Sequence, residues 1–156
     1  IDYRPYTWRS LQEASRTYLK AAETSDIVVG NDDEFGVMAE DYNDGIKLAQ
    51  KLSKSTASIV IYKKGEQGSI TFAENEKIKT GIFQVHALKP TGAGDAFMGV
   101  FISSLLNKKS IKDSVIDSSA SAAIVVTKVG CSPAMPSKES LELFLKENLI
   151  TNFKGS

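Results

Sequence analysis

The chain has 156 residues, of which 42% are hydrophobic, a normal size and composition for one soluble globular domain. Its 19 basic residues balance 19 acidic ones, so it lacks the positive excess of nucleic-acid-binding proteins. No apolar run approaches the roughly 20 residues that span a bilayer, and the single cysteine excludes an intrachain disulfide. We therefore expect a cytoplasmic protein without a signal peptide that binds neither nucleic acid nor membrane.

The first segment, residues 1–8, is expected to leave a strand and carries Arg4. The planar guanidinium fork pairs well with carboxylate or phosphate, which makes Arg4 a candidate substrate contact. An exposed arginine in a loop is an equally good interpretation. Ser10 followed by Glu13 is a capping box, and it predicts a helix that runs to about Glu23.

A short apolar run, residues 25–30, predicts a buried strand that ends just before Asn31 and Glu34. Ligands bind at the carboxyl ends of strands in open α/β sheets. Three residues apart at a helix start, Asn31 and Glu34 face the same side and are candidates for a ligand site. The alternative is an acidic N-cap cluster, above all for Asp32 and Asp33.

Apolar periodicity in the next part of the chain predicts a helix over residues 43–55, strands over 57–62, 70–73 and 77–86, and a turn at 74–76. Lys63, Gly65 and Gly68 follow the first of these strands in a glycine-rich turn. A lysine in such a turn can pair with a phosphate. A hairpin turn with solvated lysines explains the same residues.

The segment Lys89-Pro90-Thr91-Gly92-Ala93-Gly94-Asp95-Ala96-Phe97 lies between a predicted strand, residues 82–87, and a predicted helix, residues 97–106. Its glycines let the backbone turn sharply and approach a ligand closely. The unpaired N–H groups at the helix start suit a phosphate or a developing oxyanion. A carboxylate base beside an anion cradle is what phosphoryl transfer to an alcohol needs. A tight turn with an acidic first helical turn is the structural alternative.

After this segment, apolar residues at helical spacing over residues 97–105 predict a helix packed against the sheet. A small-residue helix over 110–128, a loop over 130–134 and a final helix over 138–147 follow. Strands alternating with helices predict an α/β fold of three layers, αβα, with a mostly parallel sheet.

The string T-G-A-G-D-A-F, with Gly99 one turn later, resembles the C-terminal signature of the ribokinase-type (PfkB) carbohydrate kinases. The resemblance is weaker at residues 1–8, 31–34 and 63–68 and extends over nearly the whole chain. It implies a ribokinase-like fold, with Asp95 as the catalytic base and the amides of Gly92, Ala93 and Gly94 as the anion hole.

The same resemblance implies ATP as the phosphate donor and Mg²⁺ held through water by Glu34, which fits the preference of Mg²⁺ for few carboxylates and several waters. A monovalent cation is implied next to the loop over residues 130–134. The implied nucleotide contacts are Asn31, Lys63, Gly65, Gly68, Gly130 and Ser132, and the implied substrate contacts are Arg4, Lys89 and Asp95.

Lys89 stands where the family usually has an acidic residue. A lysine there, together with I-D-Y-R-P-Y-T-W at residues 1–8, resembles the branch that phosphorylates 5-dehydro-2-deoxygluconate in inositol breakdown. Asp2 occupies a position that is usually Asn in the family. Fructokinase or 2-keto-3-deoxygluconate kinase activity is the alternative within the family.

Because kinases of this family are about twice as long, the resemblance implies that residues 1–156 are the C-terminal, nucleotide-binding part of one kinase domain without its N-terminal half. Such a piece is expected to be inactive alone and to expose an apolar face for association, for example in a homodimer. A nucleotide-binding piece without catalysis is therefore a second hypothesis. A Rossmann dehydrogenase is less favoured, because Phe97 follows where its third glycine would stand.

Overall fold

A computed structural model describes residues 1–55, 58–73 and 75–155. The chain divides into two compact units, the first formed by residues 1–79 with residue 155, and the second by residues 80–154. Two sequence predictions, Ala57 as the first residue of a strand and Glu74 in a turn, lie outside the described residues.

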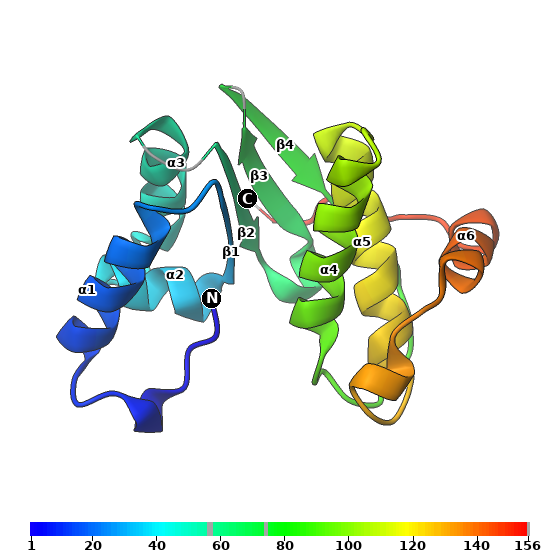
Figure 1. Cartoon of the computed structure of the whole chain (residues 1–156), viewed down its shortest axis with the longest axis horizontal. Helices are drawn as coiled ribbons and strands as arrows, with labels where there is room; N and C mark the ends of the chain where they lie inside the picture. Colours follow the sequence, from blue (N-terminus) through cyan, green and yellow to red (C-terminus); the bar gives the residue numbers. More distant parts are fainter. Residues whose placement is uncertain (56–57, 74, 156) are drawn as a thin grey trace. The chain divides into compact units, whose positions relative to one another are not determined.

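Six α-helices, four strands and three short 3₁₀ helices are described (Figure 1). In chain order they are η1 (Pro5–Thr7), α1 (Leu11–Ala22), β1 (Ile27–Asn31), α2 (Asp32–Ala39), α3 (Gly45–Ser55), β2 (Ile59–Lys63), η2 (Gly65–Gln67), β3 (Ser69–Ala73), β4 (Glu76–Thr80), α4 (Ala93–Leu106), α5 (Ile111–Val126), η3 (Ser132–Ala134) and α6 (Lys138–Glu147).

The four strands form one sheet in the order β1-β2-β3-β4. β1 and β2 are parallel and in register from Ile27 opposite Ile59 to Asn31 opposite Lys63. β2 and β3 are antiparallel, as expected for two strands joined by a short turn, whereas the parallel pair needs the longer crossover through α2 and α3. The sheet is therefore mixed, and the predicted parallel pairing is found between β1 and β2.

Helices α2 and α3 pack on the sheet, and α1 packs on α2. Figure 1 shows these three helices on one side of β1 and β2. The side chains of Val60 and Tyr62 alternate with those of Ile59 and Ile61 across the pleat of β2. The Tyr62 ring lies against the Phe35 ring of α2, with centroids 5.2 Å apart, so this face of the sheet meets α2.

The second unit is built on the antiparallel pair α4 and α5. Near one end of the pair, Ala96 and Val125 share a buried cluster, and near the other, the Ser104 hydroxyl donates to the Asp117 carboxylate at 2.8 Å. Helix α6 packs on α5 through Phe83, whose ring meets that of Phe144 at 5.3 Å between centroids.

The predicted helices are confirmed to within two residues at either end, except that α4 begins at Ala93, four residues before its predicted start at Phe97. The strand predicted over residues 82–87 is wrong. β4 ends at Thr80, and beyond it only Phe83 forms a bridge, to Ile150, in the part of the chain that the structure describes. The alternating apolar residues in this segment mark an extended chain packed on helices: Phe83 and Val85 contact the cluster between α5 and α6. Period-two burial identifies a half-buried extended segment and does not require a neighbouring strand.

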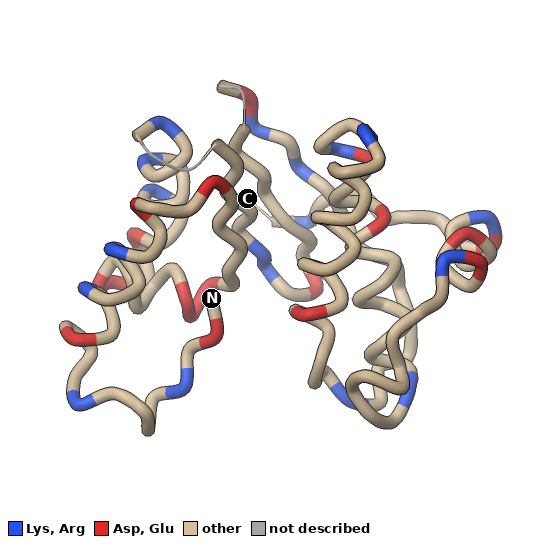
Figure 2. The backbone as a smooth tube through the Cα atoms, in the orientation of Figure 1, with Lys and Arg blue, Asp and Glu red and all other residues tan. Residues whose placement is uncertain are grey.

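The first eight residues contain a 3₁₀ turn, η1, and no strand. Acidic and basic residues are interspersed along the backbone of both units (Figure 2). Among the described residues, every helix is too short or too polar to cross a membrane.

Candidate active site

The loop before α4 ends in backbone donors that face no acceptor among the described residues. Gly92 is the N-cap, with a φ of 87°, and α4 begins at Ala93. The Ala93 N–H donates to the Pro90 carbonyl at 3.3 Å. The N–H groups of Gly94 and Asp95 have no acceptor within residues 1–55, 58–73 and 75–155. Two donors therefore lie at the positive end of the helix dipole, where an anion is stabilised.

Gly92 is required for the shape of this loop. Its positive φ is a conformation that side-chain-bearing residues rarely adopt. A Cβ atom at this position would also lie 2.7 Å from the Cys131 Sγ and 3.5 Å from Val125. The loop thus passes directly over Cys131, a contact that holds it against the segment following α5.

Asp95 is the third residue of α4, and its side chain is exposed. The structure assigns this carboxylate neither an ion pair nor a hydrogen bond among the residues it describes. A carboxylate in the first helical turn is stabilised by the helix dipole. A carboxylate without a partner among the described residues is chemically able to accept a proton, so the role of Asp95 as the base stays a prediction.

The segment carrying Lys89 is held against the end of α5. The N–H groups of Leu88 and Lys89 both donate to the Val126 carbonyl, at 2.7 and 3.2 Å. Gly130 follows with a φ of 102°, and η3 begins two residues later at Ser132. The side chain of Lys89 is exposed.

A buried cluster joins the start of α4, the end of α5 and η3. Ala134, in η3, packs with Ala96 of α4 and Val125 of α5. Around this cluster the second unit brings together seven of the predicted site residues: Lys89, Gly92, Ala93, Gly94, Asp95, Gly130 and Ser132.

Asn31 and Glu34 form a capping box at the start of α2. The Asn31 side-chain oxygen accepts from the Glu34 N–H at 2.9 Å, and Glu34 Oε2 accepts from the Asn31 N–H at 2.7 Å. The cap that sequence analysis attributed to Asp32 and Asp33 is therefore made by Asn31 and Glu34 themselves. Glu34 is 8% exposed, and the capping box engages its Oε2 atom.

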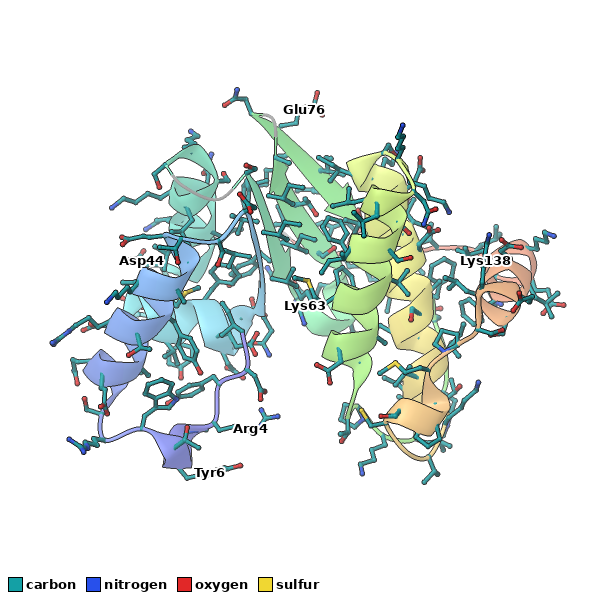
Figure 3. The ribbon with its side chains drawn as sticks, in the orientation of Figure 1. Arg4, Tyr6, Asp44, Lys63, Glu76 and Lys138 are labelled. Atoms are coloured by element: carbon teal, nitrogen blue, oxygen red, sulfur yellow. The ribbon has the colours of Figure 1, made fainter. Side chains whose placement is uncertain are left out.

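Lys63 lies at the carboxyl end of β2, directly opposite Asn31 on β1. Figure 3 shows its side chain at the end of the sheet near η2. The turn after it is closed by a hydrogen bond from the Lys64 N–H to the Gly68 carbonyl at 2.7 Å. Gly65 and Gly68 have φ values of 53° and 107°. The predicted hairpin turn is thus confirmed, and Lys63 and Asn31 share one edge of the sheet.

Tyr62 and Asp32 are a pair that sequence analysis missed. Burial, and then the hydrogen bond of the Tyr62 hydroxyl to the Asp32 carboxylate, raise the pKa of Tyr62. The Tyr62 hydroxyl therefore stays protonated near the edge that holds Asn31 and Lys63. A tyrosine immediately before Lys63 was the available signal, but which acidic residue it meets depends on the register of β1 and β2.

Arg4 belongs to the loop before α1 and extends outward from it in Figure 3. Its guanidinium pairs with Asp2 at 2.8 Å, and the two side chains are 55% and 73% exposed. It also donates to the Tyr3 carbonyl at 3.2 Å. Because an exposed ion pair contributes little to stability, the pairing matters mainly for the direction in which the guanidinium points.

The predicted site residues thus form two groups. Those of the first unit are Arg4, Asn31, Glu34, Lys63, Gly65 and Gly68, and the others belong to the second unit. Within the described parts of the chain, no three His, Cys, Asp or Glu side chains are close enough to hold a metal ion together. A metal held by Glu34 and waters stays a prediction.

The sequence profile of the pfkB family of carbohydrate kinases matches residues 1–138. The chain belongs to this family. One curated relative is the 5-dehydro-2-deoxygluconokinase of Photobacterium profundum, which is 41% identical over 151 residues. That alignment covers 94% of this chain and 46% of the relative, so the chain spans about half the length of the relative.

Solved structures of the family share the fold. A ribokinase from Thermotoga maritima matches with a TM-score of 0.73 at 33% identity, covering 78% of this chain and 42% of the ribokinase. An Arabidopsis thaliana ribokinase complexed with ribose and ATP matches with a TM-score of 0.70 at 26% identity, covering 80% of this chain and 42% of that protein. The predicted ribokinase-like α/β fold is therefore confirmed.

Proposed function

We propose that this pfkB chain is the C-terminal, nucleotide-binding part of an ATP-dependent kinase that phosphorylates a hydroxyl of a sugar acid. The observation that carries the proposal is the start of α4, where the N–H groups of Gly94 and Asp95 and the Asp95 carboxylate all lack a partner among the described residues. Donors for a transferred anion and a base for the attacking hydroxyl are the two elements that the reaction needs.

In the proposed reaction the Asp95 carboxylate takes the proton of the substrate hydroxyl. The hydroxyl oxygen forms a bond to the γ-phosphorus of ATP as the bond between that phosphorus and the bridging oxygen breaks, and ADP leaves with the bridging oxygen. The N–H groups of Gly94 and Asp95, which have no acceptor among the described residues, stabilise the charge on the transferred group. General-base assistance of this kind contributes about 10²- to 10⁴-fold.

Nucleotide binding is assigned to the edge of the sheet and to the loop after α5. Asn31, Lys63 and the η2 turn with Gly65 and Gly68 would lie along the phosphates, with Gly130 and Ser132 beside the base. Glu34 Oε1 would hold Mg²⁺ through water, and the ion would neutralise phosphate charge during transfer. ATP bound to the Arabidopsis ribokinase supports ATP as the donor.

The best substrate candidate is 5-dehydro-2-deoxygluconate, which the name of the Photobacterium relative supports. A sugar acid offers a carboxylate, and Arg4 and Lys89 are two exposed cations suited to bind one. Fructose and 2-keto-3-deoxygluconate are the competing substrates. A substrate panel with the full-length protein decides among them, and a preference for neutral hexoses would refute the sugar-acid assignment.

The base is tested with Asp95→Asn in the full-length protein. We expect turnover to fall about 10²- to 10⁴-fold while MgADP binding is retained. Asp113→Asn is a matched control, because Asp113 is the third residue of α5 as Asp95 is of α4 and accepts a hydrogen bond from Ser110 at 2.6 Å. Wild-type turnover by Asp95→Asn would exclude Asp95 as the base.

The nucleotide assignment is tested by calorimetric titration of the 156-residue chain with MgADP. Saturable binding that Lys63→Ala weakens supports it. A chain with a folded near-ultraviolet dichroism spectrum that binds no MgADP would contradict the nucleotide assignment. Saturable binding without turnover by the full-length protein would favour a binding role without catalysis.

A further inference from the structure

Residues 2–8 form a loop whose two ends meet one side chain of α1. Tyr18 donates its hydroxyl to the Asp2 carbonyl at 3.0 Å. Its ring stands edge-on to the Tyr3 ring, with centroids 6.4 Å apart, and to the Trp8 ring, at 5.2 Å. Tyr18 therefore contacts the chain on both sides of Arg4.

Between these contacts the loop is closed by its own hydrogen bonds. The Thr7 N–H and hydroxyl both donate to the Arg4 carbonyl, at 3.0 and 2.8 Å. The Trp8 N–H donates to the Pro5 carbonyl at 3.4 Å. The backbone on the C-terminal side of Arg4 is thus a 3₁₀ turn, η1, whose position depends on where Trp8 is held.

The Arg4 side chain itself is oriented from the other end of the loop. Its guanidinium pairs with Asp2, and the carbonyl of this same Asp2 accepts the Tyr18 hydroxyl. Burial raises the pKa of Tyr18, which keeps its hydroxyl protonated as a donor. Tyr18 of α1 therefore helps to position Arg4 through Asp2. Arg4 itself has no hydrogen bond or ion pair with α1 among the described residues.

From these contacts we infer that Tyr18 is a positioning residue for Arg4, holding the loop of residues 2–8 so that the guanidinium presents to the carboxylate of the sugar acid. The inference rests on the proposed function, in which Arg4 binds that carboxylate. It adds a residue of α1 to the determinants of substrate affinity, although the described contacts of Tyr18 are with Asp2, Tyr3 and Trp8 and not with Arg4.

The test is Tyr18→Phe in the full-length protein, with 5-dehydro-2-deoxygluconate as the probe. Loss of one hydroxyl should raise KM for the sugar acid about 2- to 10-fold, while KM for MgATP and kcat stay at wild-type values. In an Arg4→Ala background the same substitution should leave KM for the sugar acid unchanged, because Tyr18 acts through Arg4. Tyr42→Phe, which makes the same chemical change on a tyrosine that is 57% exposed, is the matched control.

Two results would overturn the inference. An active wild-type protein whose Tyr18→Phe variant keeps its KM for the sugar acid, or raises both KM values together, would show that Tyr18 has no role or only a general structural one. An equal rise in KM for the sugar acid when Tyr18→Phe is made in the Arg4→Ala background would also exclude a role through Arg4. A wild-type protein that binds MgADP but phosphorylates no sugar acid would overturn the proposed function, and this inference with it.

Discussion

Replacing Gly92 with alanine tests the anion-binding loop directly. The new Cβ would lie 2.7 Å from the Cys131 Sγ, a separation that real Cβ atoms do not show, so the loop or Cys131 must move. Overpacking of this kind costs about 1 to 3 kcal/mol. Gly92 also has a φ of 87°, in the left-handed region. An alanine held in this conformation would cost roughly a further 1 to 2 kcal/mol.

We therefore expect Gly92→Ala to lower the free energy of unfolding by about 2 to 5 kcal/mol. Urea denaturation of the variant and of Gly92→Ala/Cys131→Ala separates the two causes. Removing the sulfur should restore only the overpacking part, about 1 to 3 kcal/mol, and leave the backbone part in place. MgADP titration of the same variants reports whether the moved loop still binds nucleotide.

The control is Gly99→Ala, about two turns further along α4. A Cβ atom there would meet nothing within 4 Å among the described residues, and Gly99 lies inside the helix. Alanine should stabilise the protein by about 0.5 to 1 kcal/mol. Equal stabilities of the Gly92→Ala variant and the wild type would refute the loop geometry, including the contact with Cys131.

Three further substitutions test the frame around the site, each by the shift in the free energy of unfolding. Lys108→Gly should stabilise by about 1 kcal/mol, because Lys108 follows the C-cap of α4 and has a φ of 61°. Destabilisation would contradict that conformation. Gly81→Ala should destabilise by about 2 kcal/mol or more, because the new Cβ atom would overlap the Thr151 carbonyl. An unchanged free energy of unfolding would exclude the close approach of Gly81 to Thr151. Asp117→Ala should lower the free energy of unfolding by about 1 to 3 kcal/mol, because the buried carboxylate accepts from Lys109 Nζ at 2.6 Å. A smaller decrease would mean that solvent replaces the ion pair.

The helices and their starts could be predicted from the sequence because the signals are local. Ser10 caps α1 by accepting from the Glu13 N–H at 3.1 Å, as the spacing of the two residues indicates. Ser137 likewise caps α6, whose bounds the apolar pattern predicted. The turn around Gly65 follows from glycines at positive φ, whereas α4 begins at Ala93, four residues before its predicted start.

The strand predicted over residues 82–87 is an example of what local signals cannot predict. Alternating burial can be satisfied by helices as well as by a second strand, and here Phe83 packs between α5 and α6. A strand needs a partner for its backbone, and the sequence of one segment does not specify that partner.

By itself, the sequence determined the family, the order of the helices and the chemical types at the site, because glycines, caps and the G-A-G-D string act over a few residues. Only the tertiary structure decided the pairs that join distant segments. Tyr62 with Asp32, Gly92 with Cys131, and Tyr18 with Asp2 are each separated by 16 or more residues. Such contacts depend on strand register and helix packing, which a local pattern does not encode, and they hold Arg4 and the start of α4 in position.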